Sequence, residues 1–351
     1  MDYKKRLSKA RELLQGHADY MIIGPGSNMF YFTGFMEEPM ERPILLILGD
    51  DQYIIAPKIY EEQLSSIDME VRTYNDGEDP YTLANIRSGS LLAIDDQLWS
   101  VFLIALLNRF SPSNIIPAST VTKPLRSVKD EEELEIMRAG LKIAEESLVE
   151  FSSKIKEGLS ECHLAQQLET VFRERGVVPS FSTILTSGPN TSMPHLRCTD
   201  RKVHPGEPII ADFGVKYRGY STDTTRVLSI GKLSNEVQKI WSIVKEAMLS
   251  AEESQFGLSG KEIDERARKL ISDRGYGKFF IHRTGHGIGI DVHEEPYIST
   301  DNKDIISENS VFTIEPGIYI PGKFGIRIED MVVMRRRLEV LNSLEKEIIM
   351  I

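Results

Sequence analysis

The chain has 351 residues, of which 41% are hydrophobic and 27% charged, and its formal net charge is -11 at pH 7. This length predicts two domains with separate cores, and this composition predicts a chain that folds throughout. The acidic balance argues against nucleic acid as a partner, because phosphate neutralisation needs clustered lysine and arginine, and the one basic run at residues 335–337 is short.

The first 122 residues predict a small α/β domain. An amphipathic helix over residues 1–16 precedes short apolar runs that alternate with turns, and the GDDQ segment at residues 49–52 predicts a hairpin. The helix lacks the apolar core of a signal sequence, and the run VFLIALL at residues 101–107 is too short to span a bilayer. We therefore expect a cytoplasmic protein that does not bind membranes.

The two cysteines, Cys162 and Cys198, form no CxxC pair and are too few for a disulfide framework. We expect both to be thiols without a role, which is typical of a reducing compartment.

A long helix marks the start of the second domain, which we place at residues 123–351. Ser127 is its expected N-cap, and apolar residues at helical spacing predict one buried face: Leu134, Met137, Leu141, Ala144 and Leu148. Further helices are expected near residues 160–175, 234–255 and 259–274, the last with a capping box of Ser259 and Glu262. Antiparallel strands between these helices indicate an α+β fold with the helices covering one sheet face.

The first of two hairpins in this domain carries a pair of aspartates. Within DFGVKYRGYSTDTTR, residues 212–226, a turn centred between Tyr217 and Arg218 places Asp212 opposite Asp223. Two bare carboxylates at that separation repel each other, so the pairing predicts a cation between them.

The second hairpin repeats the arrangement with two glutamates. Its turn at PGKFG is centred on Gly322, which places Glu315 opposite Glu329. A single pair is more often a solvated pair on a sheet edge, but four acids inside apolar strands need a cation or strongly shifted pKa values. We therefore predict a metal site.

A glycine-rich segment is predicted to supply a further ligand. HRTGHGIGIDVHEEP, residues 282–296, holds His282, His286 and His293, and its glycines exclude a stable helix and let the backbone pass close to a ligand around His286. Oxygen ligands with one imidazole suit Mn, Co, Fe or Zn. Four carboxylates and one imidazole exceed the ligand count of a single catalytic ion, so we expect two divalent metal ions.

Several segments, taken in order, resemble the signature blocks of a known family. TSGPNTSMPH, DFGVKYRGYSTDTTR, HRTGHGIGIDVHEEP, EPGIYI and GIRIED are similar to those of the Xaa-Pro peptidases, dinuclear metallopeptidases of the pita-bread fold that include prolidase and aminopeptidase P. NMFYFTGF and LRSVKDEEELEIMRAG resemble the prolidase and aminopeptidase P branch. The resemblance implies a pita-bread catalytic domain over residues 123–351.

The resemblance also implies the metal ligands. Asp212 would bind the first metal ion, and Asp223 and Glu329 would bridge both ions. His286 and Glu315 would complete the second.

Four further groups would bind substrate, move protons and stabilise the tetrahedral intermediate: His195, His282, His293 and Arg327. Glu315 would handle the proton of the attacking water, and His293 or His195 would donate to the oxyanion and the leaving group. The alternative is that His282 only supports other side chains and that Arg327 only pairs with an acid.

The implied function is metal-dependent hydrolysis of Xaa-Pro bonds in short proline-containing peptides by a homodimer. We expect a dipeptidase; the alternatives are an aminopeptidase P, a non-peptidase metalloenzyme and a metal-free binding protein on the same fold. A dipeptidase must bind the free carboxylate of the C-terminal proline. Some prolidases carry an arginine after the proline of the HExP segment, where this chain has Tyr297, so Arg327, His195 or a basic residue from the partner chain or the N-terminal domain is expected to bind it.

Overall fold

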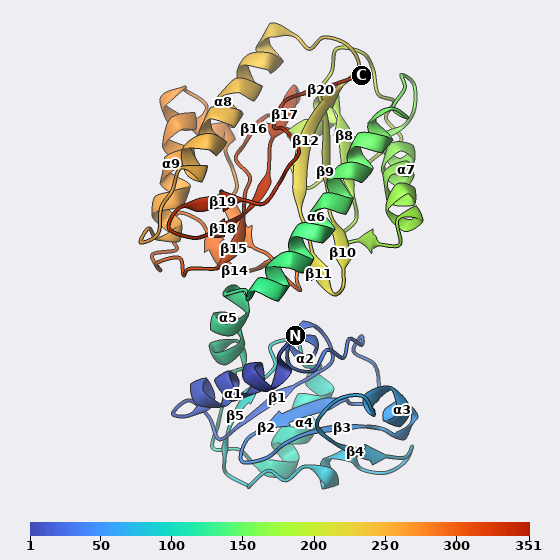
Figure 1. The fold of residues 1–351 in the computed structure, drawn as a ribbon, viewed down its shortest axis with the longest axis vertical. Helices are drawn as coiled ribbons and strands as arrows, with labels where there is room; N and C mark the ends of the chain where they lie inside the picture. Colours follow the sequence, from blue (N-terminus) through green and yellow to red (C-terminus); the bar gives the residue numbers. More distant parts are fainter. The chain divides into compact units, whose positions relative to one another are not determined.

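The structure, a computed structural model, describes residues 1–351, and the chain divides into two units, Met1–Arg126 and Ser127–Ile351. Both units combine helices with β-sheet (Figure 1). No helix in either unit is long and apolar enough to cross a membrane.

The first unit contains a six-stranded mixed sheet in the order β4-β3-β2-β1-β5-β6. Its strands are β1 (Tyr20–Ile23), β2 (Leu45–Leu48), β3 (Gln52–Pro57), β4 (Glu70–Tyr74), β5 (Leu91–Ile94) and β6 (Asn114–Pro117). Its α-helices are α1 (Tyr3–Leu14), α2 (Ser27–Thr33), α3 (Glu61–Leu64), α4 (Ser100–Phe110) and α5 (Ser119–Ser127). The predicted GDDQ hairpin is confirmed, because β2 and β3 pair antiparallel across it.

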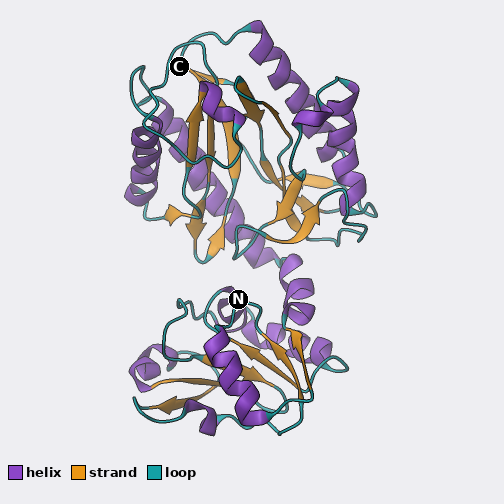
Figure 2. Cartoon of the chain, turned by 180° about the vertical axis from the view of Figure 1, so that it is seen from behind, coloured by secondary structure: helices purple, strands orange, loops and turns teal.

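The second unit has long helices on the outside of several short sheets (Figure 2). The helices are α6 (Glu131–Ser152), α7 (Glu161–Glu174), α8 (Asn235–Glu252) and α9 (Gly260–Asp273). The strands are β7 (Val178–Pro179), β8 (Ile184–Ser187), β9 (Ile209–Phe213), β10 (Val215–Tyr217), β11 (Tyr220–Ser221), β12 (Thr224–Ser229), β13 (Gly285–Gly287), β14 (Glu294–Ile298), β15 (Val311–Ile314), β16 (Gly317–Ile320), β17 (Phe324–Arg327), β18 (Asp330–Met334), β19 (Leu338–Val340) and β20 (Ile349–Met350).

Two hydrophobic cores hold the second unit. Helices α6 and α7 pack on β8, β9 and β12 through residues such as Leu148 and Phe213, and helices α8 and α9 pack on β15 to β18 through residues such as Ile240 and Phe312. The first core fixes β9, which carries Asp212, and β12, which follows Asp223 directly, and the second fixes the strands on either side of Glu315 and Glu329.

The predicted buried face of α6 is confirmed, but its N-cap is not Ser127. All five apolar positions are buried. Asp130 caps the helix: its side chain accepts from the N–H of Glu133, whose side chain accepts from the N–H of Asp130. This capping box satisfies two free N–H groups at once, which Ser127, the last residue of α5, does not do. The predicted box of Ser259 and Glu262 at the start of α9 is present.

Candidate functional site

One pocket of the second unit, about 320 Å³ in volume, brings together all nine residues that the sequence singled out. They are His195, Asp212, Asp223, His282, His286, His293, Glu315, Arg327 and Glu329. The volume is at the small end of the range for ligand sites and suits a small substrate.

The register of the first hairpin differs from the prediction. Asp212 pairs with Thr225 in the ladder of β9 and β12, and not with Asp223. The turn consists of Arg218 and Gly219, both with positive φ (48° and 88°), as two-residue type I′ turns require. The turn centre is therefore one residue later than predicted, which shifts the pairing by two residues. Because side chains alternate with period two, both aspartates still face the same pocket.

The second hairpin has the predicted register. Its turn contains Gly322 with φ of 71°, and the ladders of β15 with β18 and of β16 with β17 lie on either side of Glu315 and Glu329. Glu329 also forms an isolated bridge to Thr225 of β12. The acids of the two hairpins therefore converge around Thr225.

His286 is presented by β13, which lies between β14 and β15. A Cβ atom on Gly285 would lie 1.8 Å from the carbonyl oxygen of Thr313, and one on Gly287 would lie 2.2 Å from that of Glu295. These glycines are thus required by the close approach of the neighbouring strands.

The ring of His286 is oriented as in metal-binding histidines. Its Nδ1 lies 3.0 Å from the carbonyl oxygen of Gly287, to which it donates. Its Nε2 then carries the lone pair, 3.5 Å from Glu315 Oε1 and 3.7 Å from Asp223 Oδ2. Ligand atoms of Asp223, His286 and Glu329 all lie within 4.8 Å of one another.

The acids of this cluster lack enough protein donors. Asp212 Oδ1 and Asp223 Oδ1 are buried without a hydrogen-bond partner. Burial, followed by the charges of neighbouring acids, raises the pKa of Asp223 and of Glu329 well above their usual range. Burial raises the pKa of Glu315 to about 7 and lowers that of His286 to about 3. Unbonded oxygens and acids that ionise only against strong repulsion fit a bound divalent cation, so the residues present suit the predicted metal.

Arg327 is held by the site itself. Its Nη2 donates to Asp212 Oδ2 at 2.6 Å, its Nη1 to Tyr319 Oη at 2.8 Å, and its Nε to Thr225 Oγ1 at 3.1 Å. The Thr225 hydroxyl in turn donates to Glu329 Oε2 at 2.7 Å. All three guanidinium nitrogens are engaged, so Arg327 has few donors left for a substrate carboxylate.

The three other predicted groups fall into two kinds. His282 Nδ1 donates to the carbonyl oxygen of Arg283 at 2.7 Å, and its Nε2 lies 2.9 Å from Tyr319 Oη, so both ring nitrogens are engaged. His195 and His293 are exposed at the pocket surface, and the rings of His293 and His286 lie 4.2 Å apart. Only His195 and His293 are free to meet a substrate.

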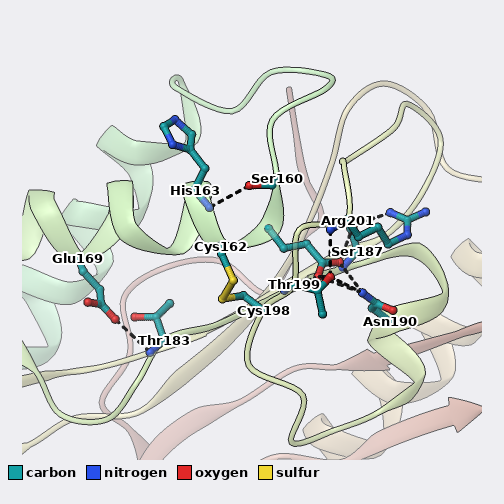
Figure 3. Close-up of a disulfide and its surroundings, with 11 residues drawn as sticks. Ser160, Cys162, His163, Glu169, Thr183, Ser187, Asn190, Cys198, Thr199 and Arg201 are labelled. Carbon is teal, nitrogen blue, oxygen red and sulfur yellow. Dashed lines mark hydrogen bonds between the residues drawn. A yellow bond between two sulfur atoms is a disulfide. The ribbon is translucent and has the colours of Figure 1, made fainter.

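A disulfide anchors the segment that carries His195. Cys198 is bonded to Cys162 of α7, 36 residues away (Figure 3). Our expectation of two thiols is therefore wrong, and with it the argument from the cysteines for a reducing compartment. The pairing depends on α7 lying beside residues 193–201, here called the His195 segment, which neither the number nor the spacing of the cysteines reveals.

A buried carboxylate reinforces this anchor. Glu161, fully buried in the first turn of α7, accepts hydrogen bonds of 2.7–3.1 Å from Ser187, Asn190 and Thr199. Glu161 has no distinctive signal in the sequence, because an acid in the first turn of a helix is normally explained by the helix dipole alone. The His195 segment is thus fixed to α7 by a covalent bond and by a hydrogen-bonded carboxylate.

Two arginines of the pocket were also missed. Arg197 comes from the His195 segment, and Arg283 follows His282. The Arg283 guanidinium carbon lies 4.2 Å from the centre of the Tyr297 ring. The position of Arg283 inside the quoted histidine motif was the one available signal.

Comparison with known proteins agrees with this geometry. Residues 135–336 match metallopeptidase family M24, and residues 6–128 match the creatinase/prolidase N-terminal domain. An uncharacterized peptidase of Staphylococcus aureus (strain USA300) is 35% identical over 95% of this chain and 97% of its own length. A recombinant prolidase from Thermococcus sibiricus is 39% identical with a TM-score of 0.93, covering 100% of both chains. An X-Pro aminopeptidase from Thermotoga maritima is 33% identical with a TM-score of 0.87, covering 99% of this chain and 100% of its own.

These matches confirm the predicted fold, a small N-terminal α/β domain followed by a pita-bread domain. They also confirm the resemblance to the Xaa-Pro peptidases. The chain belongs to metallopeptidase family M24.

Proposed function

We propose that this protein is a metal-dependent Xaa-Pro dipeptidase. The observation that carries the proposal is the convergence of Asp223, His286 and Glu329, with ligand atoms within 4.8 Å of one another, beside buried carboxylate oxygens that have no partner. Similarity to a solved prolidase over the whole chain supports the choice of a dipeptidase.

Five residues would hold two divalent ions, taken from Mn, Co, Zn and Fe: Asp212, Asp223, His286, Glu315 and Glu329. Bound there, the ions would supply a water of lowered pKa and a Lewis acid for the scissile carbonyl. The chain offers no serine or cysteine nucleophile in the pocket that could replace them, because Ser182 has no histidine or acid partner and both cysteines are bonded.

The surrounding side chains then divide the work. Glu315, which lies in the pocket with its Oε1 3.5 Å from His286 Nε2, can accept and return a proton. His293 and His195, at the pocket surface, can donate to the oxyanion and to the leaving proline nitrogen. Arg327 orients Asp212, and His282 orients Tyr319, which accepts from Arg327.

The test is hydrolysis of Ala-Pro and of the same dipeptide extended by one residue, after chelation and again after reloading with Mn or Co. We expect activity only in the loaded protein and a higher kcat/KM for the dipeptide. Equal or faster cleavage of the extended peptide would assign the protein as an Xaa-Pro aminopeptidase. Full activity in a demonstrably metal-free sample would reject the mechanism, and no hydrolysis in a loaded sample would favour a binding protein.

A further inference from the structure

Two arginines line the pocket without an acidic partner. Arg197 and Arg283 form neither an ion pair nor a side-chain hydrogen bond, although the chain has 53 acidic against 42 basic residues. Arg327, in the same pocket, is bonded through all three guanidinium nitrogens. An unpaired guanidinium in a pocket of an acidic protein is suited to an anionic group of a ligand, because guanidinium and carboxylate match in charge and shape.

Arg283 is fixed in place by an aromatic ring. Its guanidinium carbon lies 4.2 Å from the centre of the Tyr297 ring. Hydrogen bonds also hold the backbone at Arg283. The ring of His282 donates to the carbonyl oxygen of Arg283, and the N–H of Thr284 donates to the carbonyl oxygen of Ile298 at 2.9 Å. Stacking sets the plane of the guanidinium and leaves its N–H donors available.

We propose that Arg283, stacked on Tyr297, binds the free C-terminal carboxylate of the substrate. This inference rests on the proposed dipeptidase function. Tyr297 stands where some prolidases carry an arginine, and here it serves as a positioning residue for an arginine from the neighbouring strand end.

The position of Arg283 in the pocket suits the length of a dipeptide. The carboxylate of a dipeptide lies one residue beyond the scissile bond, so its receptor must lie close to the catalytic groups. Arg283 lines the same pocket as His293 and Glu315. Arg197 belongs to the His195 segment and is exposed, which makes it the matched control.

The experiment compares kcat/KM for Ala-Pro and for Ala-Pro amide in the Mn-loaded protein and its variants. Blocking the carboxylate should cost the unchanged protein about tenfold to hundredfold. Arg283→Met should lose a similar factor on Ala-Pro and far less on the amide, so that the preference disappears. Tyr297→Leu should weaken the preference for Ala-Pro over its amide by raising KM for Ala-Pro. Tyr297→Phe keeps an aromatic ring under Arg283 and should show the preference of the unchanged protein, and Arg197→Met should show it too.

Inhibition by L-proline and L-prolinamide gives a second readout that does not depend on the hydrolysis step. Arg283→Met should raise the inhibition constant of proline and leave that of prolinamide nearly unchanged. If the unchanged protein shows no preference for the free carboxylate, the proposed dipeptidase function fails. If the unchanged protein shows the preference and Arg283→Met or Tyr297→Leu retains it, the assignment of the carboxylate to Arg283 fails. The same holds if Arg197→Met is the one variant that loses the preference. In both cases the proposed dipeptidase function stands.

Discussion

Removing the metal ions should make the stability of this protein fall as the pH rises above neutrality. In the metal-free chain, burial and neighbouring acids raise the pKa of Asp223 and of Glu329 well above their usual range. In the unfolded chain the same groups ionise near about pH 4. Between these limits the folded state keeps protons that the unfolded state has lost, so a rise in pH favours unfolding.

The size of the effect follows from proton linkage. Each such group lowers the free energy of unfolding by about 1.4 kcal/mol per pH unit while the pH stays below its folded pKa, so two groups give up to about 3 kcal/mol per unit. His282 and His286, whose pKa values are lowered to about 3, act in the opposite direction. Their contribution to the free energy of unfolding is lost as the pH falls below about 6.5, the pKa of histidine in the unfolded chain. Above about pH 7 both are neutral in either state, and the acids act alone.

Urea unfolding followed by circular dichroism at a series of pH values from about pH 7 upward would measure this slope. Protein loaded with Mn should show little slope, because metal-bound carboxylates are ionised in the folded as well as in the unfolded state. Asp223→Asn, which has no carboxyl proton to lose at that position, should reduce the slope of the chelated protein by about half. Equal slopes with and without metal would refute the reasoning.

Two further predictions concern single contacts of the site. Asp223→Asn should reduce the content of both metal ions, measured by elemental analysis. His293→Ala should keep the metal and lower kcat by about 10²- to 10⁴-fold. Loss of metal in the histidine variant and retention in the aspartate variant would mean that the two roles are exchanged. Thr225→Val removes the hydroxyl between Arg327 and Glu329, so the loaded protein should lose about 1 to 3 kcal/mol of unfolding free energy in urea. Thr225→Ser is the matched control, and a valine variant as stable as the serine variant would contradict the assignment.

The two hairpins show how far sequence reasoning reaches. The PGKFG turn has Gly322 at its predicted centre, and Gly322 adopts the positive φ there, so the opposition of Glu315 and Glu329 could be predicted. In the other turn both Arg218 and Gly219 adopt a positive φ, which is uncommon for residues other than glycine, so the sequence did not reveal that Arg218 belongs to the turn. The error shifted the pairing of Asp212 by two residues, which left its face unchanged, and so the predicted cluster survived a wrong register.

Contacts between distant segments could not be predicted in the same way. The pair of Cys162 and Cys198 and the stacking of Arg283 on Tyr297 both depend on which elements the fold places side by side. Neither has a local signal, since isolated cysteines, arginines and tyrosines are common in any sequence. The metal cluster was easier, because acids in apolar strands conflict with burial and so require an explanation.

The disulfide between α7 and the His195 segment bears on how this protein is handled at the bench. Thiol reductants, which are routine in purification, would release a covalent link at a segment that supplies both His195 and Arg197 to the pocket. Thiolates also bind the soft and borderline metals that a laboratory would add to activate the protein. Preparations made with and without reductant are therefore two chemical species, and their kinetic constants are comparable only after free thiols and bound metal have been counted in each.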